Sequence, residues 1–339
     1  MVKKLKWLSL LAIAAIVLLL GAYFALVNHI AQVSLQLPAG IHQVNAGSSA
    51  LSLCRQWQQQ GVISRSDCQL LRLYLKLKPV EGAVKQGVYR LETEQGLLEV
   101  LALFRSGREA QFAITLIEGE TLSQSLSRLA QAPYLVQDLD SAAQVQALLQ
   151  WPPQWGEPPQ TSEALLYPDT YYYTANSPVS ALVKRAQQLL LTELEHAWQQ
   201  RQGDLPLQNP YQLLILASII EKESSYPPEK PLVASVFVNR LRKNMRLQTD
   251  PTVIYGLVDF NGNITRADLN NPHPYNTYRH RGLPPGPISL VSRASLQAAA
   301  QPAETELYYF VSKGDGTHQF SSTLEQHNAA VRKYILGGR

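Results

Sequence analysis

The sequence lacks the motifs that would indicate metal, nucleotide or serine-hydrolase chemistry. It contains no His-Glu-x-x-His pattern, no Gly-x-Ser-x-Gly nucleophile elbow, and no Walker or dinucleotide-binding glycine motif. His273 and His280 lie in a proline-containing segment without a carboxylate at metal-ligand spacing. We therefore expect no metal site and no cofactor.

Positive charge is scarce beyond the N-terminus. The formal net charge is +4 over 339 residues, and Lys3, Lys4 and Lys6 supply three of these charges, which leaves about +1 for the rest. A nearly neutral surface does not favour the phosphate backbone of a nucleic acid. We therefore do not expect nucleic acid as a partner.

An uncharged apolar run, Trp7–Val27, follows those lysines. Its length suits a helix crossing a hydrocarbon core of about 30 Å. No lysine or arginine follows until Arg55, so the positive-inside rule puts the N-terminus in the cytoplasm. A cleaved signal peptide is the alternative, but the run exceeds a typical signal core and no clear cleavage site follows. We predict a cytoplasmic tail at 1–6, a transmembrane helix at 7–27, and the remainder outside the cytoplasm.

Cysteine occurs twice, at Cys54 and Cys68. The two residues lie on predicted helices on either side of the turn "QQGVISRSD", and an extracytoplasmic location would allow them to pair. A disulfide and two reduced buried thiols both fit this pattern.

The pattern of elements indicates an α+β fold. Residues 28–110 show short strands and helices typical of a small α+β module, and residues 111–339 indicate a mixed, helix-rich domain. Residues 132–160 are rich in glutamine, proline and tryptophan, so Trp151 and Trp155 either pack a loop or line a sugar-binding cleft. Helix starts are marked by five polar residues: Thr121, Asn209, Asp250, Ser292 and Thr323.

The segment "SIIEKESSYPP" ends an apolar helix in two glutamates, Glu221 and Glu223. Residues on a helix advance by about 100°, so these two side chains point about 200° apart and must have different roles. An ordinary solvated helix end is the alternative for both.

Glu221 shares its helix face with Leu214, Ala217 and Ser218, which are apolar or small. Partial desolvation on such a face would raise the pKa of the carboxyl and suit it to act as a general acid. Glu223 lies over isoleucines without a comparable notch, and this favours a supporting role.

Two polar segments, "RLQTDPTVIYG" and "YNTYRHRGLPPG", combine aromatic faces with amides and hydroxyls. Such a mixture suits a carbohydrate, although helix caps and turns would equally explain Asp250 and Asn276. The candidate glycan-binding residues are Gln248, Thr249, Asp250, Tyr255, Tyr275, Asn276, Thr277 and Tyr278.

Several blocks in this order resemble the YceG-like family, the endolytic murein transglycosylases of the bacterial inner membrane. The blocks are "LLYPDTYYY", "LASIIEKES", "VASVFVNRLRKNMRLQTDPTVIYG", "YNTYRHRGLPPGPI" and "LYYFVSKGDGTHQF", within about residue 88 to the C-terminus. The resemblance implies a single-pass anchor, a LysM-like module at 28–110 and a catalytic domain at 111–339. One departure is Glu163-Ala164, where the family usually has Glu-Gly.

The resemblance also implies an activity. Glu221, the first glutamate of the Glu-Lys-Glu block, would cleave the bond between N-acetylmuramic acid and N-acetylglucosamine and leave a 1,6-anhydromuramoyl end. The nucleophile is then the substrate's own 6-hydroxyl, so a second catalytic carboxylate is not required. Supporting roles fall to Glu223, Ser218, Asn239 and Glu163.

Two competing hypotheses remain at this stage. A hydrolytic muramidase would take Asp250 or Glu163 as its second carboxylate, and a scaffold would bind peptidoglycan without cleaving it. By resemblance, we expect the catalytic part in the periplasm, acting on nascent glycan strands beside penicillin-binding synthases.

Overall fold

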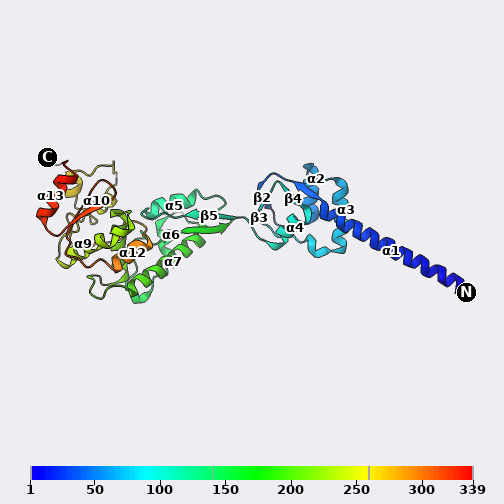
Figure 1. Cartoon of the computed structure of the whole chain (residues 1–339), viewed down its shortest axis with the longest axis horizontal. Coiled ribbons are helices and arrows are strands. Elements are labelled where there is room, and N and C mark those ends of the chain that lie inside the picture. The colour runs from blue at the N-terminus through cyan, green and yellow to red at the C-terminus, as the bar shows by residue number, and fades with distance from the viewer. Residues whose placement is uncertain (1, 140, 259, 338–339) are drawn as a thin grey trace. The chain divides into compact units, whose positions relative to one another are not determined.

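The computed structural model describes residues 2–139, 141–258 and 260–337, and the chain divides into two compact units, Met1–Phe112 and Ala113–Arg339 (Figure 1). Both units mix helices with short strands, which confirms the predicted α+β class. Met1 and the side chain of Lys3, both in the predicted cytoplasmic tail, lie outside the described residues.

The first unit is built on four helices and two pairs of antiparallel strands. Strand β1 pairs with β4, and β2 pairs with β3 with His42 opposite Tyr89. Its elements are α1 (Val2–Gln32), β1 (Ser34–Gln36), β2 (Gly40–Val44), α2 (Ala50–Gln59), α3 (Arg65–Leu77), β3 (Gly87–Leu91), β4 (Glu94–Gly96) and α4 (Leu97–Ser106). The strand and helix order expected for 28–110 is present, while the likeness to LysM stays a prediction.

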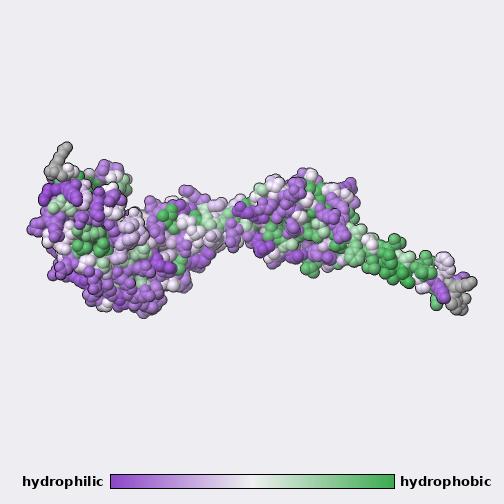
Figure 2. Space-filling view, viewed as in Figure 1, coloured by the Kyte–Doolittle hydropathy of each residue, from purple (hydrophilic) through white to green (hydrophobic). Residues whose placement is uncertain are grey.

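Helix α1 is longer than the predicted transmembrane segment. The stretch Lys4–Gln32 is long and apolar enough to cross a membrane, and Figure 2 shows the hydrophobic surface of this helix. Leu26 and Ile30, near its C-terminal end, are buried in the core of the first unit. The helix therefore fits a membrane anchor that continues into the folded module.

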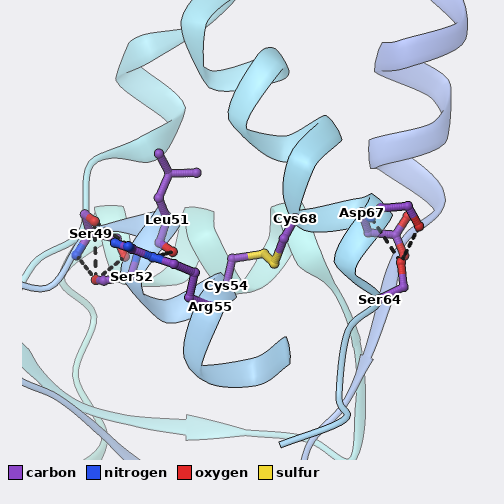
Figure 3. Close-up of a disulfide and its surroundings, with 9 residues drawn as sticks. Ser49, Leu51, Ser52, Cys54, Arg55, Ser64, Asp67 and Cys68 are labelled. Atoms are coloured by element: carbon purple, nitrogen blue, oxygen red, sulfur yellow. Dashed lines mark hydrogen bonds between the residues drawn. A yellow bond between two sulfur atoms is a disulfide. The ribbon is translucent and has the colours of Figure 1, made fainter. Parts of the chain in front are cut away.

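Cys54 and Cys68 form a disulfide between α2 and α3, with Cα atoms 5.8 Å apart (Figure 3). Both helices begin at serine caps: the hydroxyl of Ser49 accepts from the Ser52 amide, and that of Ser64 accepts from the Asp67 amide. Of the two alternatives left by the sequence, the structure has the disulfide.

Helices outnumber strands in the described part of the second unit. Residues 132–160, expected to form a loop, include the short helix α6, and the predicted hairpin near the C-terminus is formed by β7 and β8. Strand β5 (Gln111–Thr115) spans the boundary between the two units in the sequence. The elements that follow are α5 (Leu122–Ala130), α6 (Ala142–Ala147), β6 (Thr170–Thr174), α7 (Val179–Gln199), α8 (Pro210–Glu223), α9 (Lys230–Arg242), α10 (Asp250–Gly256), α11 (Arg266–Asn270), α12 (Arg293–Ala300), β7 (Tyr309–Ser312), β8 (His318–Ser321) and α13 (Leu324–Tyr334).

Helix α8 forms the centre of this unit's core. Asn209 caps it by accepting from the Gln212 amide at 2.9 Å, and Pro210 occupies the first helical position, as predicted. Leu213–Ile220 are buried on all sides, and α7, α9, α10 and α12 pack around the helix. A helix enclosed in this way can expose polar side chains to solvent or substrate only at its ends.

The structure decides two local expectations, the cap of α10 and the role of the tryptophans. Asp250 is not the cap of α10: Thr249 holds that position and Asp250 is the first helical residue. The Asp250 carboxylate accepts from the Tyr278 hydroxyl at 2.6 Å. Trp151 and Trp155 pack edge to face with centroids 5.1 Å apart, and Trp155 is buried, so the loop-packing alternative describes them.

Candidate active site

Glu221 is held in a polar cluster between α8, α9 and α12. Its carboxylate accepts hydrogen bonds from the Lys230 ammonium at 3.0 Å, the Ser292 amide at 2.9 Å and the Ser295 hydroxyl at 2.7 Å. The side chains of Glu221 and Lys230 are only 7% and 3% exposed. The carboxylate is therefore a component of a buried ion pair.

The surroundings of Glu221 favour its ionised form. Burial alone would raise the pKa of this carboxyl, but the two serines and the ammonium outweigh burial and hold the pKa below its ordinary value. The predicted raised pKa for Glu221 is thus wrong. Leu214 and Ala217, which share its helix face, are buried in the core.

Glu223, two residues later, lines an open cavity of about 430 Å³. Burial raises the pKa of its carboxyl to about 7, with Asp250 adding to the shift and the Thr249 hydroxyl, which donates to it, acting against it. A carboxyl with this pKa is substantially protonated at neutral pH. Of the two glutamates, Glu223 therefore has the protonation expected of a general acid.

Three of the predicted glycan-binding residues line the same cavity. These are Gln248, Asp250 and Tyr278. Gln248 has a left-handed backbone with φ 48°, which is uncommon for a residue other than glycine and is often found at functional sites. The Asp250–Tyr278 hydrogen bond joins the two polar segments at the cavity wall.

The side chains of the other predicted residues, Thr249, Asn276 and Thr277, make hydrogen bonds inside the fold. Thr249 and Thr277 are buried, and the Thr249 amide donates to the Thr277 hydroxyl at 3.1 Å. Asn276 is buried and its amide donates to three backbone carbonyls, those of Asp268, Leu269 and Asn271. These side chains fix the segments and leave the cavity wall to their neighbours.

Tyr255 and Glu163 belong to a second cavity, of about 650 Å³. The buried Glu163 carboxylate accepts from the Leu122 amide at 2.8 Å and the Tyr255 hydroxyl at 3.2 Å, and burial raises its pKa. Tyr275 packs on Tyr255 with centroids 4.8 Å apart. Ala164, which stands at the family's glycine position, has φ 60° and so occupies a conformation that favours glycine.

Ser218 and Asn239 make contacts inside the fold. The Ser218 hydroxyl accepts from the Ile288 amide at 3.0 Å, and the Asn239 amide donates to the carbonyls of Thr305 and Leu307. Each of these two side chains links its own helix to a segment about 70 residues away in the sequence.

The sequence reasoning missed several residues at the cavity of Glu223. Arg240 donates to the carbonyls of Leu247 and Tyr308 at 2.8 and 2.7 Å, and its guanidinium lies over the Tyr309 ring at 5.2 Å. Tyr309 and His327 complete this wall. The only feature of the sequence that pointed to Arg240 was its position next to Asn239, a predicted supporting residue. The hairpin and last helix were recognised as elements, with no indication that they reach the site.

Comparisons with a protein-family model, with other proteins and with solved structures all point to one family. Residues 42–333 match the model of the YceG-like family. An endolytic murein transglycosylase of Bacillus subtilis is 30% identical over 318 residues, covering 86% of this chain and 84% of the relative. An endolytic murein transglycosylase of Streptococcus pneumoniae D39 is 24% identical, and the match spans 88% of this chain but 51% of that longer protein. The crystal structure of a yceG-like protein from Listeria monocytogenes aligns with a TM-score of 0.53 at 27% identity, over 88% of this chain and 98% of that one.

Proposed function

The chain belongs to the YceG-like family, and from this we propose that it is an endolytic murein transglycosylase that cleaves peptidoglycan glycan strands. The bond cleaved would be that between N-acetylmuramic acid and N-acetylglucosamine, with a 1,6-anhydromuramoyl end as product. The names of the relatives support the reaction class, and the surroundings of the two glutamates support the assignment of the acid.

We assign the acid step to Glu223 rather than to Glu221, the residue to which the family resemblance assigned it. One observation carries this choice: Glu223 lines a cavity together with Gln248, Asp250 and Tyr278 and has a pKa of about 7, whereas Glu221 is ionised in a buried pair with Lys230. A general acid needs an exchangeable proton and access to the substrate. Of the two glutamates, Glu223 lines a cavity and has the raised pKa, and on this basis we propose it as the acid.

In the proposed mechanism Glu223 protonates the glycosidic oxygen as the bond to C1 of the muramoyl residue breaks. The resulting carboxylate then takes the proton of the muramoyl 6-hydroxyl while that oxygen bonds to C1. The acid is regenerated and no water is consumed. Because the nucleophile belongs to the substrate, its proximity replaces a second protein carboxylate.

The cavity offers groups suited to hold the glycan. Tyr278 and Tyr309 present aromatic rings, while Gln248 and Asn328 present amides. Arg240 is fixed by backbone carbonyls, so its charge remains beside the acid without forming an ion pair with it. We propose that these groups bind the two sugar residues on either side of the bond that breaks.

A hydrolytic muramidase remains the second candidate because Asp250 lines the same cavity as Glu223. In that reaction Asp250 would activate water or form the glycosyl intermediate. Glu163 is the weaker alternative for this role, since it lines the separate second cavity.

The two reactions differ in whether oxygen from water enters the product. The full chain in detergent would be incubated with purified glycan strands in water enriched in ¹⁸O, and the products would be analysed by mass spectrometry. Unlabelled anhydromuramoyl ends made by wild type support transglycosylation. Labelled reducing ends would indicate hydrolysis, and the absence of cleavage would favour the scaffold hypothesis.

The location of the activity follows from α1. We propose that the apolar helix Lys4–Gln32 anchors the chain in the inner membrane with its N-terminus in the cytoplasm and its catalytic unit in the periplasm. The enzyme would then act on strands emerging near the membrane and terminate them beside penicillin-binding synthases.

A further inference from the structure

The C-terminal part of α1 packs against α3 in the first unit. His29 of α1 contacts Asp67 near the start of α3, with 2.6 Å between Nε2 and Oδ1. Further along, burial and the Glu81 carboxylate raise the pKa of the Tyr74 hydroxyl to about 12, and Tyr23 of α1 adds to this shift. The two helices therefore run antiparallel, and α3 points back along α1 toward its N-terminus.

This direction brings the end of α3 beside the apolar run of α1. Helices rise about 1.5 Å per residue, so the ten residues from Asp67 to Leu77 cover about 15 Å. The same distance along α1 from His29 leads well into Trp7–Val27, the run that suits a bilayer core. The end of α3 and the 3₁₀ helix after it, Pro79–Gly82, thus lie beside the C-terminal half of the apolar run of α1.

Large apolar side chains are exposed at this end of α3. Leu73, Leu77 and Val80 are 49%, 53% and 73% exposed. Leu73 and Leu77 do not share the side of α3 that carries the buried Leu71 and Tyr74, and Val80 follows in the 3₁₀ helix Pro79–Gly82. We call Leu73, Leu77 and Val80 the α3 apolar patch.

Basic side chains accompany the patch. Arg72 and Lys76 are exposed on the same helix, and Lys78 lies over the Tyr74 ring at 5.5 Å. Apolar side chains flanked by lysine and arginine are typical of segments that lie in the headgroup region of a bilayer. Exposed apolar side chains that gather at one place are typical of surfaces that bind a partner or a membrane.

We propose that the α3 apolar patch inserts into the interface of the bilayer that α1 crosses, with Arg72 and Lys76 at the phospholipid headgroups. Unit 1 then contacts the membrane at two points, the transmembrane helix and the end of α3. The second contact fixes the rotation of this unit about the α1 axis. The basic side chains beside the patch, and the packing of α3 on the apolar helix α1, select lipid as the occupant.

The proposal can be tested by measuring the membrane depth of single nitroxide labels. The two native cysteines are paired, so a cysteine introduced at Leu77 or Val80 is the reactive thiol for labelling. Gln69→Cys is the matched control, because Gln69 is exposed on the same helix but lies eight residues before Leu77, or about 12 Å away. Leu18→Cys, in the exposed apolar part of α1, gives the reference for the bilayer interior.

The labelled full-length chains would be reconstituted in vesicles of phosphatidylcholine and phosphatidylglycerol. We expect the labels at Leu77 and Val80 to collide with a polar nickel chelate about tenfold less often than the label at Gln69, because such a chelate is excluded from hydrocarbon. Their collision rate with oxygen should rise toward that at Leu18.

Two outcomes would overturn the proposal. Equal access of the nickel chelate to all three positions on α3 and its following turn would place the patch in water. Protection accompanied by spin–spin broadening that persists in dilute detergent would show that a second copy of the chain, and not lipid, covers the patch.

Discussion

Glu221 and Glu223 lie two residues apart in the last turn of α8, yet their surroundings are opposite. Glu221 meets an ammonium and two serines from α9 and α12, and its pKa is lowered. Glu223 meets a threonine hydroxyl and a second carboxylate at a cavity, and its pKa is raised. The comparison teaches that distant segments packed on a helix end, and not the helix sequence, decide which carboxyl keeps its proton.

The largest effect is expected from removing the acid. Glu223→Gln should lower kcat by about 10²- to 10⁴-fold, the usual contribution of a general acid. The amide has the shape of the carboxylic acid, so the melting temperature should change little. Rates of anhydromuramoyl formation and a thermal scan of the same sample would measure both.

Glu221→Gln is the matched variant for this comparison. It should destabilise the protein more than Glu223→Gln, since it leaves the Lys230 ammonium buried without its partner, while the folded fraction retains the acid. Normal activity of Glu223→Gln together with abolished activity of a fully folded Glu221→Gln would reverse the assignment.

The next effect concerns stability. Lys230→Met leaves the Glu221 carboxylate buried without its cation, and breaking such a pair costs about 3–5 kcal/mol. Urea unfolding of wild type and variant would measure the loss. Lys243→Met, at an exposed position just after the same helix, is the control and should be nearly neutral. Equal stabilities of the two variants would mean that the buried ion pair contributes nothing.

A smaller effect is expected from pH. The acid must be protonated, and the raised pKa of Glu223 keeps the proton up to about pH 7. The value of kcat/KM should therefore decline as the pH rises through 7, approaching a tenfold loss per unit. Initial rates across neutral pH would show this limb. A limb centred near the ordinary glutamate value would argue against Glu223 as the acid.

The smallest effect should come from Thr249→Val. The Thr249 hydroxyl donates to Glu223 and stabilises its ionised form, so its loss should raise the pKa of the acid further and move the alkaline limb upward by about one unit. Thr249→Ser keeps the hydroxyl and should leave the limb in place. A downward shift in the valine variant would contradict this account.

Much of the fold was predictable because its signals are local. Asn209 before Pro210 marks the start of α8, Ser292 caps α12, and the glycines Gly314 and Gly316 adopt positive φ in the β7–β8 turn. The 200° separation of Glu221 and Glu223 also follows from helix geometry alone.

The site itself was only partly predictable. Of the eight residues predicted to bind glycan because aromatic faces with amides and hydroxyls suit a carbohydrate, Gln248, Asp250 and Tyr278 line one cavity, and their binding role stays a prediction. The sequence could not show that Lys230 and Ser295 reach Glu221, since those contacts depend on how α9 and α12 pack on α8. The opposite directions of the pKa shifts of Glu221 and Glu223 follow from these long-range contacts.

The most direct test of the account is to observe which glutamate is protonated. Infrared difference spectra of the full chain, recorded across neutral pH, would follow the carbonyl band of protonated carboxyl groups in wild type, Glu221→Gln and Glu223→Gln. We predict a band that titrates near pH 7 in wild type and Glu221→Gln and is missing from Glu223→Gln. A band that is missing from Glu221→Gln and retained in Glu223→Gln would contradict the account.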